Sequence, residues 1–366
     1  MAFLTGLILL DAPASALNNA GPLLEPASTN VKAVKHIRVR GQGIFPYVSA
    51  QAFRFWLRST LEESPELEWK AAPVFREAKT AYTDANPIKY WDDDLFGYMR
   101  APSKKPGAEE ERREDQSREH QTPTSTGISR ISPFRVSTFV ALAPVSITRD
   151  YGTMSRNDGH PVPYEHEFYR TVLKGLISLN LQAAGTFSYA SRTGYRNLDD
   201  VRIELAQTVG LAHINGREKA YRMNRRERLQ RIAALLRGLA IMYGGARQTL
   251  HYTDVTPAIL IATIMRGGNN PLQYLIGSDS NTGDIRVMPE AIHQTFRVWR
   301  QQILSKLYVG WVHGFADDQR EQFKSELQAF NAQYPQKLDF TAGHPREVLE
   351  ELITDLSSDI HADWLA

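Results

Sequence analysis

The hydrophobic positions along the chain fall into short blocks, and the spacing within each block predicts a mixture of strands and helices. Four segments predict strands, either as continuous apolar runs or as blocks rich in β-branched and aromatic residues: 3–10, 131–147, 168–181 and 255–265. Two segments have apolar residues at helical spacing: 49–63 and 217–237. The predicted order is therefore strand, helix, strand, strand, helix, strand.

Three further stretches interrupt or follow these elements. Residues 102–127 lack the apolar content that orders a chain, so they predict a mobile insertion. Residues 148–161 lie between two predicted strands and contain Gly and Asn-Asp-Gly turn chemistry, which predicts the tip of a long hairpin. The remainder is mainly amphipathic, with helices expected at 291–309, 317–332 and 346–356.

The composition describes an ordinary globular protein and limits its chemistry. Of the 366 residues, 42% are hydrophobic and 23% charged, and the net charge of +2 is too small for a strong overall field, so any nucleic-acid surface must be a local cluster. The chain has no cysteine, which excludes disulfides and thiolate zinc sites and fits a reducing cytoplasm. Residues 3–16 resemble a short signal peptide, but no Lys or Arg precedes the apolar run, so we expect a buried first strand. No run is long enough to span a membrane.

The start of the helix at 49–63 has the features of a phosphate site. Ser49 is a good N-cap, and Gln51 lies in the first turn, where the helix offers unpaired N–H groups and the positive end of its dipole. Arg54 and Arg58 are four residues apart and share a face. An ordinary amphipathic helix with a capped start explains the same pattern.

Two later segments also combine glycine or arginine with a helix. Gly244 and Gly245, followed by Arg247 and Gln248, form a predicted turn at the end of the second helix. Residues 217–237 carry eight Lys or Arg against two Glu, and they form either a solvated face or a surface for nucleic acid.

Catalytic alternatives rest on carboxylates and histidines. Asp92, Asp93 and Asp94 are adjacent, as in sites for divalent ions, but neighbours on a regular element point in different directions. His36 or His251 could serve as the general base of a metal-free ribonuclease, although no partner acid is evident. We therefore expect no catalytic residue, no metal and no cofactor.

Several motifs, in this order and spacing, resemble one family. They lie at residues 10–21, 45–58, 94–99, 130–135 and 243–248. Through them the chain resembles the guide-RNA-binding backbone subunit of type I CRISPR Cascade complexes, in the branch described as DevR-type, and the resemblance spans the chain to about residue 275. The short aromatic motifs of ordinary RNA-recognition sheets are absent from the sequence.

The resemblance implies an α+β fold in the form of a hand, whose palm is a modified RNA-recognition-motif domain of ferredoxin-like order. Its fingers and thumb are insertions. The implied parts are the first half of the palm (1–63), the finger insertion with mobile loop 102–127 (64–130), the rest of the palm with thumb hairpin 148–164 (131–275), and a helical C-terminal extension (276–366).

The resemblance also implies an RNA-binding set and partners. Tyr151 or Met154 would insert between bases of the guide. The implied RNA-binding residues are Lys35, Arg38, Ser49, Gln51, Arg54, Arg58, Arg130, Arg135, Tyr151, Met154, Gly244, Gly245, Arg247 and Gln248. The implied partners are CRISPR guide RNA, target DNA within the complex, further copies of the chain in a filament and other Cascade subunits, with no membrane.

Three classes of function remain open from the sequence. The first is a non-catalytic cytoplasmic scaffold that binds guide RNA in several copies, kinks it at regular intervals and supports pairing with target DNA, in antiviral defence or RNA-guided transposition. The second is a metal-independent endoribonuclease that processes guide RNA. The third is a DNA-binding transcriptional regulator, for which no helix-turn-helix pattern is evident.

Overall fold

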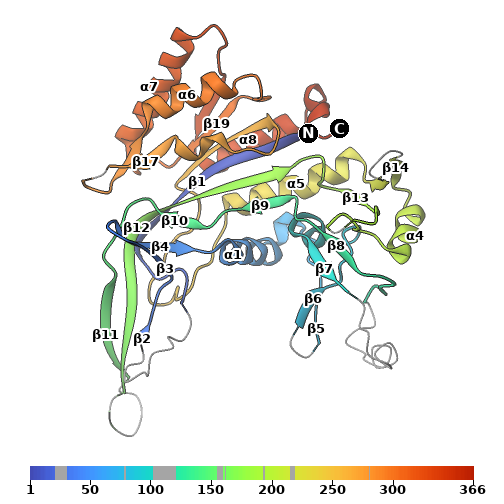
Figure 1. The fold of residues 1–366 in the computed structure, drawn as a ribbon, viewed down its shortest axis with the longest axis horizontal. Helices are drawn as coiled ribbons and strands as arrows, with labels where there is room; N and C mark the ends of the chain where they lie inside the picture. The colour runs from blue at the N-terminus through green and yellow to red at the C-terminus, as the bar shows by residue number, and fades with distance from the viewer. Residues whose placement is uncertain are drawn as a thin grey trace.

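The computed structural model describes residues 1–20, 31–77, 80–101, 121–154, 160, 162–192, 194–214, 219–279 and 281–366. Most of the expected mobile loop at 102–127 and the tip of the expected hairpin lie outside these residues. The fold is α+β and is built on a mixed sheet of eleven described strands (Figure 1). No helix among the described segments is long and apolar enough to cross a membrane.

Four antiparallel strands form the centre of the sheet in the order β16-β1-β12-β10. Leu7 of β1 lies opposite Leu176 on one side and Ile261 on the other, so the first strand is the middle of the sheet. The bounds are β1 (Ala2–Ser15), β10 (Phe139–Ala141), β12 (Val162–Asn180) and β16 (Ile259–Arg266).

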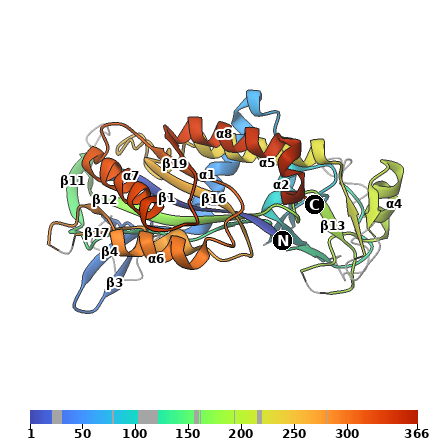
Figure 2. The same ribbon diagram turned by 90° about the horizontal axis from the view of Figure 1, so that it is seen from above.

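Helices cover both faces of this sheet (Figure 2). Alternate residues of β1 point to opposite faces: Leu4 and Ile8 pack in one hydrophobic cluster, and Leu7 and Leu9 in another. The first cluster is shared with α1 (Ala50–Glu63), α5 (Arg225–Ala240) and α8 (Pro345–Ser357), and the second with α6 (Pro289–Trp299) and α7 (Asp317–Gln333).

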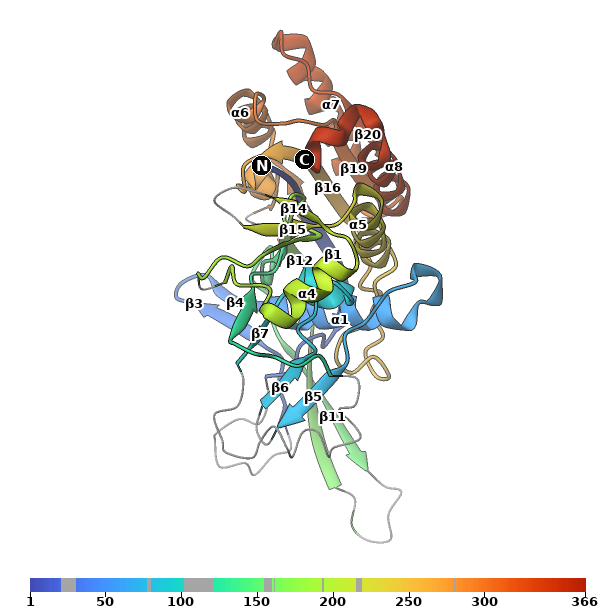
Figure 3. The same cartoon turned by 90° about the vertical axis from the view of Figure 1, so that its right-hand side faces the viewer.

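Two projections extend from the same side of the sheet (Figures 1 and 3). The long arm is an antiparallel hairpin in which Thr148 pairs with Phe168 and Met154 with Val162. The short arm is the hairpin of β5 and β6.

The remaining bounds are β2 (Val31–Lys32), β3 (His36–Val39), β4 (Gly43–Val48), η1 (Pro65–Leu67), β5 (Val74–Glu77), β6 (Thr80–Thr83), α2 (Trp91–Phe96), β7 (Tyr98–Arg100), β8 (Ile128–Arg130), β9 (Phe134–Val136), β11 (Thr148–Met154), β13 (Thr186–Ser188), α4 (Asp200–Thr208), β14 (Ala212–Ile214), β15 (Ala220–Arg222), η3 (Pro271–Tyr274), β17 (Ile276–Ser278), β18 (Ile285–Val287), β19 (Leu307–Trp311), β20 (Phe340–Gly343) and η4 (Asp359–Trp364).

The expected long strand at 131–147 and the expected helical C-terminal extension both differ from the structure. The first is divided into β9 and β10, which both pair with β12. Between them the Leu176 N–H donates to the Ser137 hydroxyl at 2.8 Å instead of to a backbone carbonyl. The second also contains strands: β19 and β20 pair in parallel and extend the main sheet beyond β16. The helix expected at 291–309 ends at Trp299, and the buried run 307–311 becomes β19.

Candidate nucleic-acid interface

A groove of about 340 Å³ lies where three segments distant in sequence meet. The segments are the chain after β1, the outward face of α1 and the turn after α5. The residues that line it are Leu17, Asn18, Asn19, Ala52, Phe55, Trp56, Ser59, Tyr243, Gly244, Gly245 and Ala246. We call this the α1 groove.

The start of α1 is fixed at the groove by two hydrogen bonds. The Ser49 hydroxyl accepts from the Ala52 N–H at 3.2 Å, which confirms the predicted N-cap, and the Ser49 N–H donates to Asn18 Oδ1 at 3.1 Å. The amides of Ala50 and Gln51 precede the first intrahelical bond, so the helix itself gives them no partner. Exposed Gln51 lies one turn before Phe55 on the groove side.

The turn after α5 needs glycine at both positions. Gly244 and Gly245 have φ angles of 149° and 108°, which side chains rarely adopt. A Cβ on Gly244 would lie 2.5 Å from Trp56, and one on Gly245 would lie 2.6 Å from Leu17. The Ala246 N–H donates to the Leu17 carbonyl at 3.0 Å. The bare backbone of this turn therefore forms one wall of the groove.

Arg54 is committed inside the protein, contrary to the expectation that it holds phosphate. Its guanidinium donates to the Phe134 carbonyl at 2.7 Å, the Phe96 carbonyl at 2.6 Å and the Ser132 hydroxyl at 3.1 Å. Burial, with a smaller effect from Arg58, lowers its pKa to about 10. Arg54 thus joins α1 to α2 and β9.

Arg58 lies on the same side of α1, away from the groove. Its guanidinium is 4.7 Å from the centre of the Phe96 ring, over which Arg54 also lies. The positive charge of Arg58 acts to lower the pKa of Asp92, although burial of Asp92 has the larger, opposite effect. The helical spacing of the two arginines is as expected, but both point to Phe96 of α2.

Arg130 and Gln248 are also committed to internal bonds. Buried Arg130 donates to the carboxylate of Asp94 and to the carbonyls of Ala183 and Thr186, so its guanidinium is engaged inside the protein and not presented to solvent as the RNA-binding prediction expects. The Gln248 amide donates to the Gly244 carbonyl, and its oxygen accepts from a backbone N–H at 2.9 Å. Gln248 therefore stabilises the turn through both ends of its side-chain amide.

Arg247 and Lys35 remain beside the groove as cations. Arg247 has a left-handed φ of 55°, and its buried Nη1 has no hydrogen-bond partner in the described part of the chain. Burial lowers its pKa, against the opposing charge of Glu167. The Lys35 N–H donates to the Asn18 carbonyl at 2.8 Å, which places this lysine next to a lining residue.

Exposed aromatic rings, which the sequence reasoning missed, surround the groove and the turn. Phe55 is 67% exposed and Tyr252 is 82% exposed, while Tyr243 is partly exposed and donates from its hydroxyl to Glu63 at 2.5 Å. Phe55 could have been found from the sequence, because it lies on the polar side of an amphipathic helix.

The long arm presents Tyr151, which is 65% exposed. Met154 ends β11, and its side chain lies outside the described structure. Gly152 lies beneath the Tyr164 ring, and a Cβ there would lie 2.6 Å from the end of that ring, which would have to move. Arg38 is exposed on β3. Arg135 is exposed on β9 and lies near neither the arm nor the α1 groove.

Four of the described arginines of the basic helix bond to other parts of the protein, and two of these four are buried. Arg228 is buried and donates to the carbonyls of Ala184, Leu181 and Leu365. Buried Arg231 donates to Asp94 Oδ2 at 2.7 Å. The others with partners are Arg225, which contacts Asp359 and three carbonyls, and Arg237, which forms a two-point ion pair with Glu350.

The three adjacent aspartates serve three separate internal contacts. Asp92 accepts from Trp69 Nε1 at 2.7 Å, Asp93 accepts from the Asn86 N–H at 2.8 Å, and Asp94 pairs with two arginines. No group of three potential metal ligands occurs among the described residues. The directions of the three carboxylates agree with the expectation that they do not converge.

The candidate bases His36 and His251 have different surroundings. The His36 Nδ1 lies 3.2 Å from the Val34 carbonyl, and His251 stacks on Phe168 with ring centres 5.1 Å apart. Neither ring has a carboxylate among its hydrogen-bond partners in the described segments, so the described residues do not supply the partner acid that the ribonuclease hypothesis needs.

No family model and no curated protein matches the chain. Solved structures do match. A chain of a "CRISPR RNA-guided surveillance complex" aligns with a TM-score of 0.50 and 12% identity, over 96% of this chain and 99% of the other. A chain of a "CRISPR RNA-guided surveillance complex, pre-nicking" aligns with a TM-score of 0.51 and 10% identity, over 97% and 100%. This protein therefore shares, over nearly its whole length, the fold of chains found in CRISPR RNA-guided surveillance complexes.

Proposed function

We propose that this protein is a non-catalytic backbone subunit that binds CRISPR guide RNA in several copies, as part of an RNA-guided surveillance complex. The α1 groove carries the proposal. It joins a helix N-terminus, a backbone turn without side chains and exposed rings in one place. In this role the chain lies beside other subunits and beside target DNA.

The fold supports the proposal. Along the chain the central elements follow the order β1, α1, β10, β12, α5, β16, which is strand, helix, strand, strand, helix, strand. In the sheet the four strands lie in the order β16-β1-β12-β10, so α1 connects β1 to β10 and α5 connects β12 to β16. That is the order of RNA-recognition domains. In this interpretation the central sheet is the palm, the short arm belongs to the fingers, and the long arm is the thumb.

The chemistry of the groove suits a strand of any sequence. Unpaired helix amides and the close approach allowed by Gly244 and Gly245 favour phosphate. Phe55 and Tyr243, which both line the groove, offer ring faces that can stack on any base without selecting one. Contacts of this type position a nucleic acid and leave its sequence to base pairing, as a carrier of guides requires.

The long arm accounts for the kinking of the guide in this proposal. It carries exposed Tyr151 away from the sheet on a hairpin that is paired over seven residues of β11. Apolar or aromatic side chains inserted between bases unstack them. Because each copy has one such arm, copies in a row kink the guide at a regular interval.

A guide-processing endoribonuclease is the second candidate, and the observations favour it less. Its possible bases, His36 and His251, lack an acid partner among the described residues, as shown above. We expect no cleavage product when the chain is incubated with guide-length RNA. Cleavage that disappears in a His251→Ala variant would support the enzyme instead.

Binding measurements on groove variants test the proposal. Phe55→Ala should weaken binding of guide-length RNA at least about fivefold, because stacking on an aromatic ring contributes ~1–3 kcal/mol per base. Arg247→Gln should reduce the salt dependence of binding by about one ion, with equal effects on unrelated RNA sequences. Tyr274→Ala is the matched control, since Tyr274 is also exposed but lies outside the groove. Equal RNA affinity of Phe55→Ala, Arg247→Gln and the wild type would refute the groove as the RNA site.

A further inference from the structure

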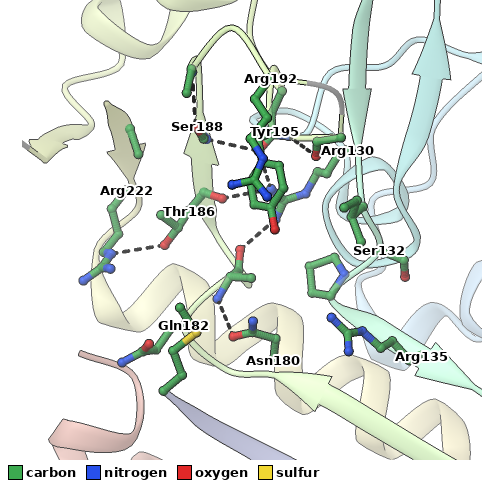
Figure 4. Close-up of a pocket in the computed structure, with 18 of the residues that line it drawn as sticks. Arg130, Ser132, Arg135, Asn180, Gln182, Thr186, Ser188, Arg192, Tyr195 and Arg222 are labelled. Atoms are coloured by element: carbon green, nitrogen blue, oxygen red, sulfur yellow. Dashed lines mark hydrogen bonds between the residues drawn. The ribbon is translucent and has the colours of Figure 1, made fainter. Parts of the chain in front are cut away.

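A second cavity lies away from the α1 groove, at the junction of the main sheet and the small sheet β13-β15-β14. Its volume is about 400 Å³. Arginines line it from three sides, with Asn180 between them (Figure 4). The walls come from the first residues of β1, from β8 and β9, from the end of β12, and from β13 and β15. We call it the arginine cavity.

Three of its guanidinium groups have no carboxylate partner in the described part of the chain. Arg135 lies 6.0 Å from the centre of the Phe3 ring. Arg192 lies 4.3 Å from the centre of the Tyr195 ring. Arg222 donates to the Thr186 hydroxyl at 3.1 Å, which leaves its two terminal nitrogens without hydrogen bonds among the described residues.

The fourth arginine, Arg130, is a contrast within the same cavity. Its charge is balanced by Asp94, as described above. No Asp or Glu occurs among the lining residues, although the whole chain has 43 basic and 41 acidic residues. Elsewhere the chain pairs such groups: Arg225, Arg237 and Arg286 each contact a carboxylate. The three unpaired charges therefore form a local site that attracts an anion.

The cavity faces away from α1. Phe134 of β9 packs into the hydrophobic cluster that contains α1, and its neighbour Arg135 points to the opposite face of the strand. An anion in the arginine cavity is therefore separated by the sheet from a strand in the α1 groove.

We propose that the arginine cavity binds the phosphate of a nucleotide, either free or within a second nucleic-acid strand. Planar guanidinium groups bind phosphate oxygens in pairs. A volume of about 400 Å³ lies within the range of sites for small ligands. Tyr195, already stacked under Arg192 and 42% exposed, provides a ring face for the base. This site goes beyond the proposed guide-binding function and does not depend on it.

Calorimetric titration of the full chain tests the site with two probes, adenosine monophosphate and a twelve-nucleotide single-stranded DNA. We expect at least one probe to bind. The double variant Arg135→Gln with Arg222→Gln should lower the affinity for that probe at least about tenfold, because it removes two charged groups that donate hydrogen bonds to the phosphate. Saturable binding of the monophosphate identifies a free nucleotide, and binding of the DNA alone identifies a strand. Arg297→Gln is the control, since Arg297 is exposed on α6 and lies outside the cavity.

The same experiment can overturn the inference in three ways. The inference fails if the wild type binds neither probe, or if the double variant binds a probe as tightly as the wild type does. It also fails if inorganic phosphate competes for the site as strongly as adenosine monophosphate, because the base would then contribute nothing to binding. A thermal melt of each variant checks that the fold is intact. Guide-length RNA is titrated in parallel. Weaker RNA binding in Phe55→Ala, with binding of the probe to the arginine cavity unchanged, separates the two sites.

Discussion

Replacing Asp94 by Asn should strongly destabilise the fold, because this carboxylate balances two buried arginines. Asp94 is fully buried and pairs with Arg130 and, at 2.7 Å, with Arg231. It also accepts from the Gly185 N–H at 2.9 Å. An amide is neutral, so both guanidinium groups lose their counter-charge. Its oxygen can still accept from one arginine, but its NH₂ group turns toward the other. Removing one partner of a buried ion pair costs ~3–5 kcal/mol, and we expect a loss of about that size in the free energy of unfolding.

Urea denaturation, followed by circular dichroism, measures this loss as a shift in the midpoint. Asp359→Asn is the matched control: Asp359 also pairs with an arginine, Arg225 at 2.9 Å, but its side chain is 98% exposed. An exposed pair of this kind contributes at most ~1 kcal/mol. If Asp94→Asn lowers the stability by no more than Asp359→Asn does, the assignment of Asp94 as the centre of the buried cluster is wrong.

Three further changes test other parts of the structure. Burial raises the pKa of Asp93 from 3.8 to about 6, so between these pH values the folded state binds more protons than the unfolded state, and the free energy of unfolding falls as the pH rises, by at most about 3 kcal/mol. Urea titrations at pH 4 and pH 7 should show a smaller fall in Asp93→Asn than in the wild type, and an equal fall would contradict this. At Gly245 the φ angle is 108° and an added Cβ would meet Leu17, so Gly245→Ala should lower the free energy of unfolding by ~1–3 kcal/mol. Gly210→Ala should cost less, because φ is also positive there but the space is open, and equal losses would contradict the steric argument. Arg54→Gln should lower the free energy of unfolding by at least ~2 kcal/mol in thermal or urea denaturation, since it leaves the carbonyls of Phe96 and Phe134 without their charged donor. Arg38→Gln, at an exposed residue, should leave stability unchanged; an unchanged stability in Arg54→Gln would mean that Arg54 is free to bind phosphate.

Local chemistry made the α1 region predictable from the sequence. The N-cap at Ser49, the helix to Glu63 and the φ angles of Gly244 and Gly245 depend on residues within one or two turns of each other. Three of the four central strands were also found, at 3–10, 168–181 and 255–265. The fourth, β10, is only a short part of the strand expected at 131–147. Their pairing into the order β16-β1-β12-β10 agrees with the predicted sequence of elements.

The roles of the arginines could not be predicted, because their partners are distant in sequence. Arg54 bonds to Phe134, 80 residues away, and Arg231 to Asp94, 137 residues away. A run of basic residues has the same pattern whether its charges meet carbonyls, carboxylates or solvent. The arginine cavity was missed for the same reason: Arg135, Arg192 and Arg222 meet only after the small sheet packs against β9.

The central claim is that several copies of this chain bind along one RNA, and native mass spectrometry with RNAs of increasing length tests it most directly. The account predicts that the number of bound chains rises in steps, one for each constant increment of RNA length, and that the steps are the same for unrelated sequences. Phe55→Ala should keep the increment and require a higher protein concentration. A single bound chain at every RNA length would contradict the account.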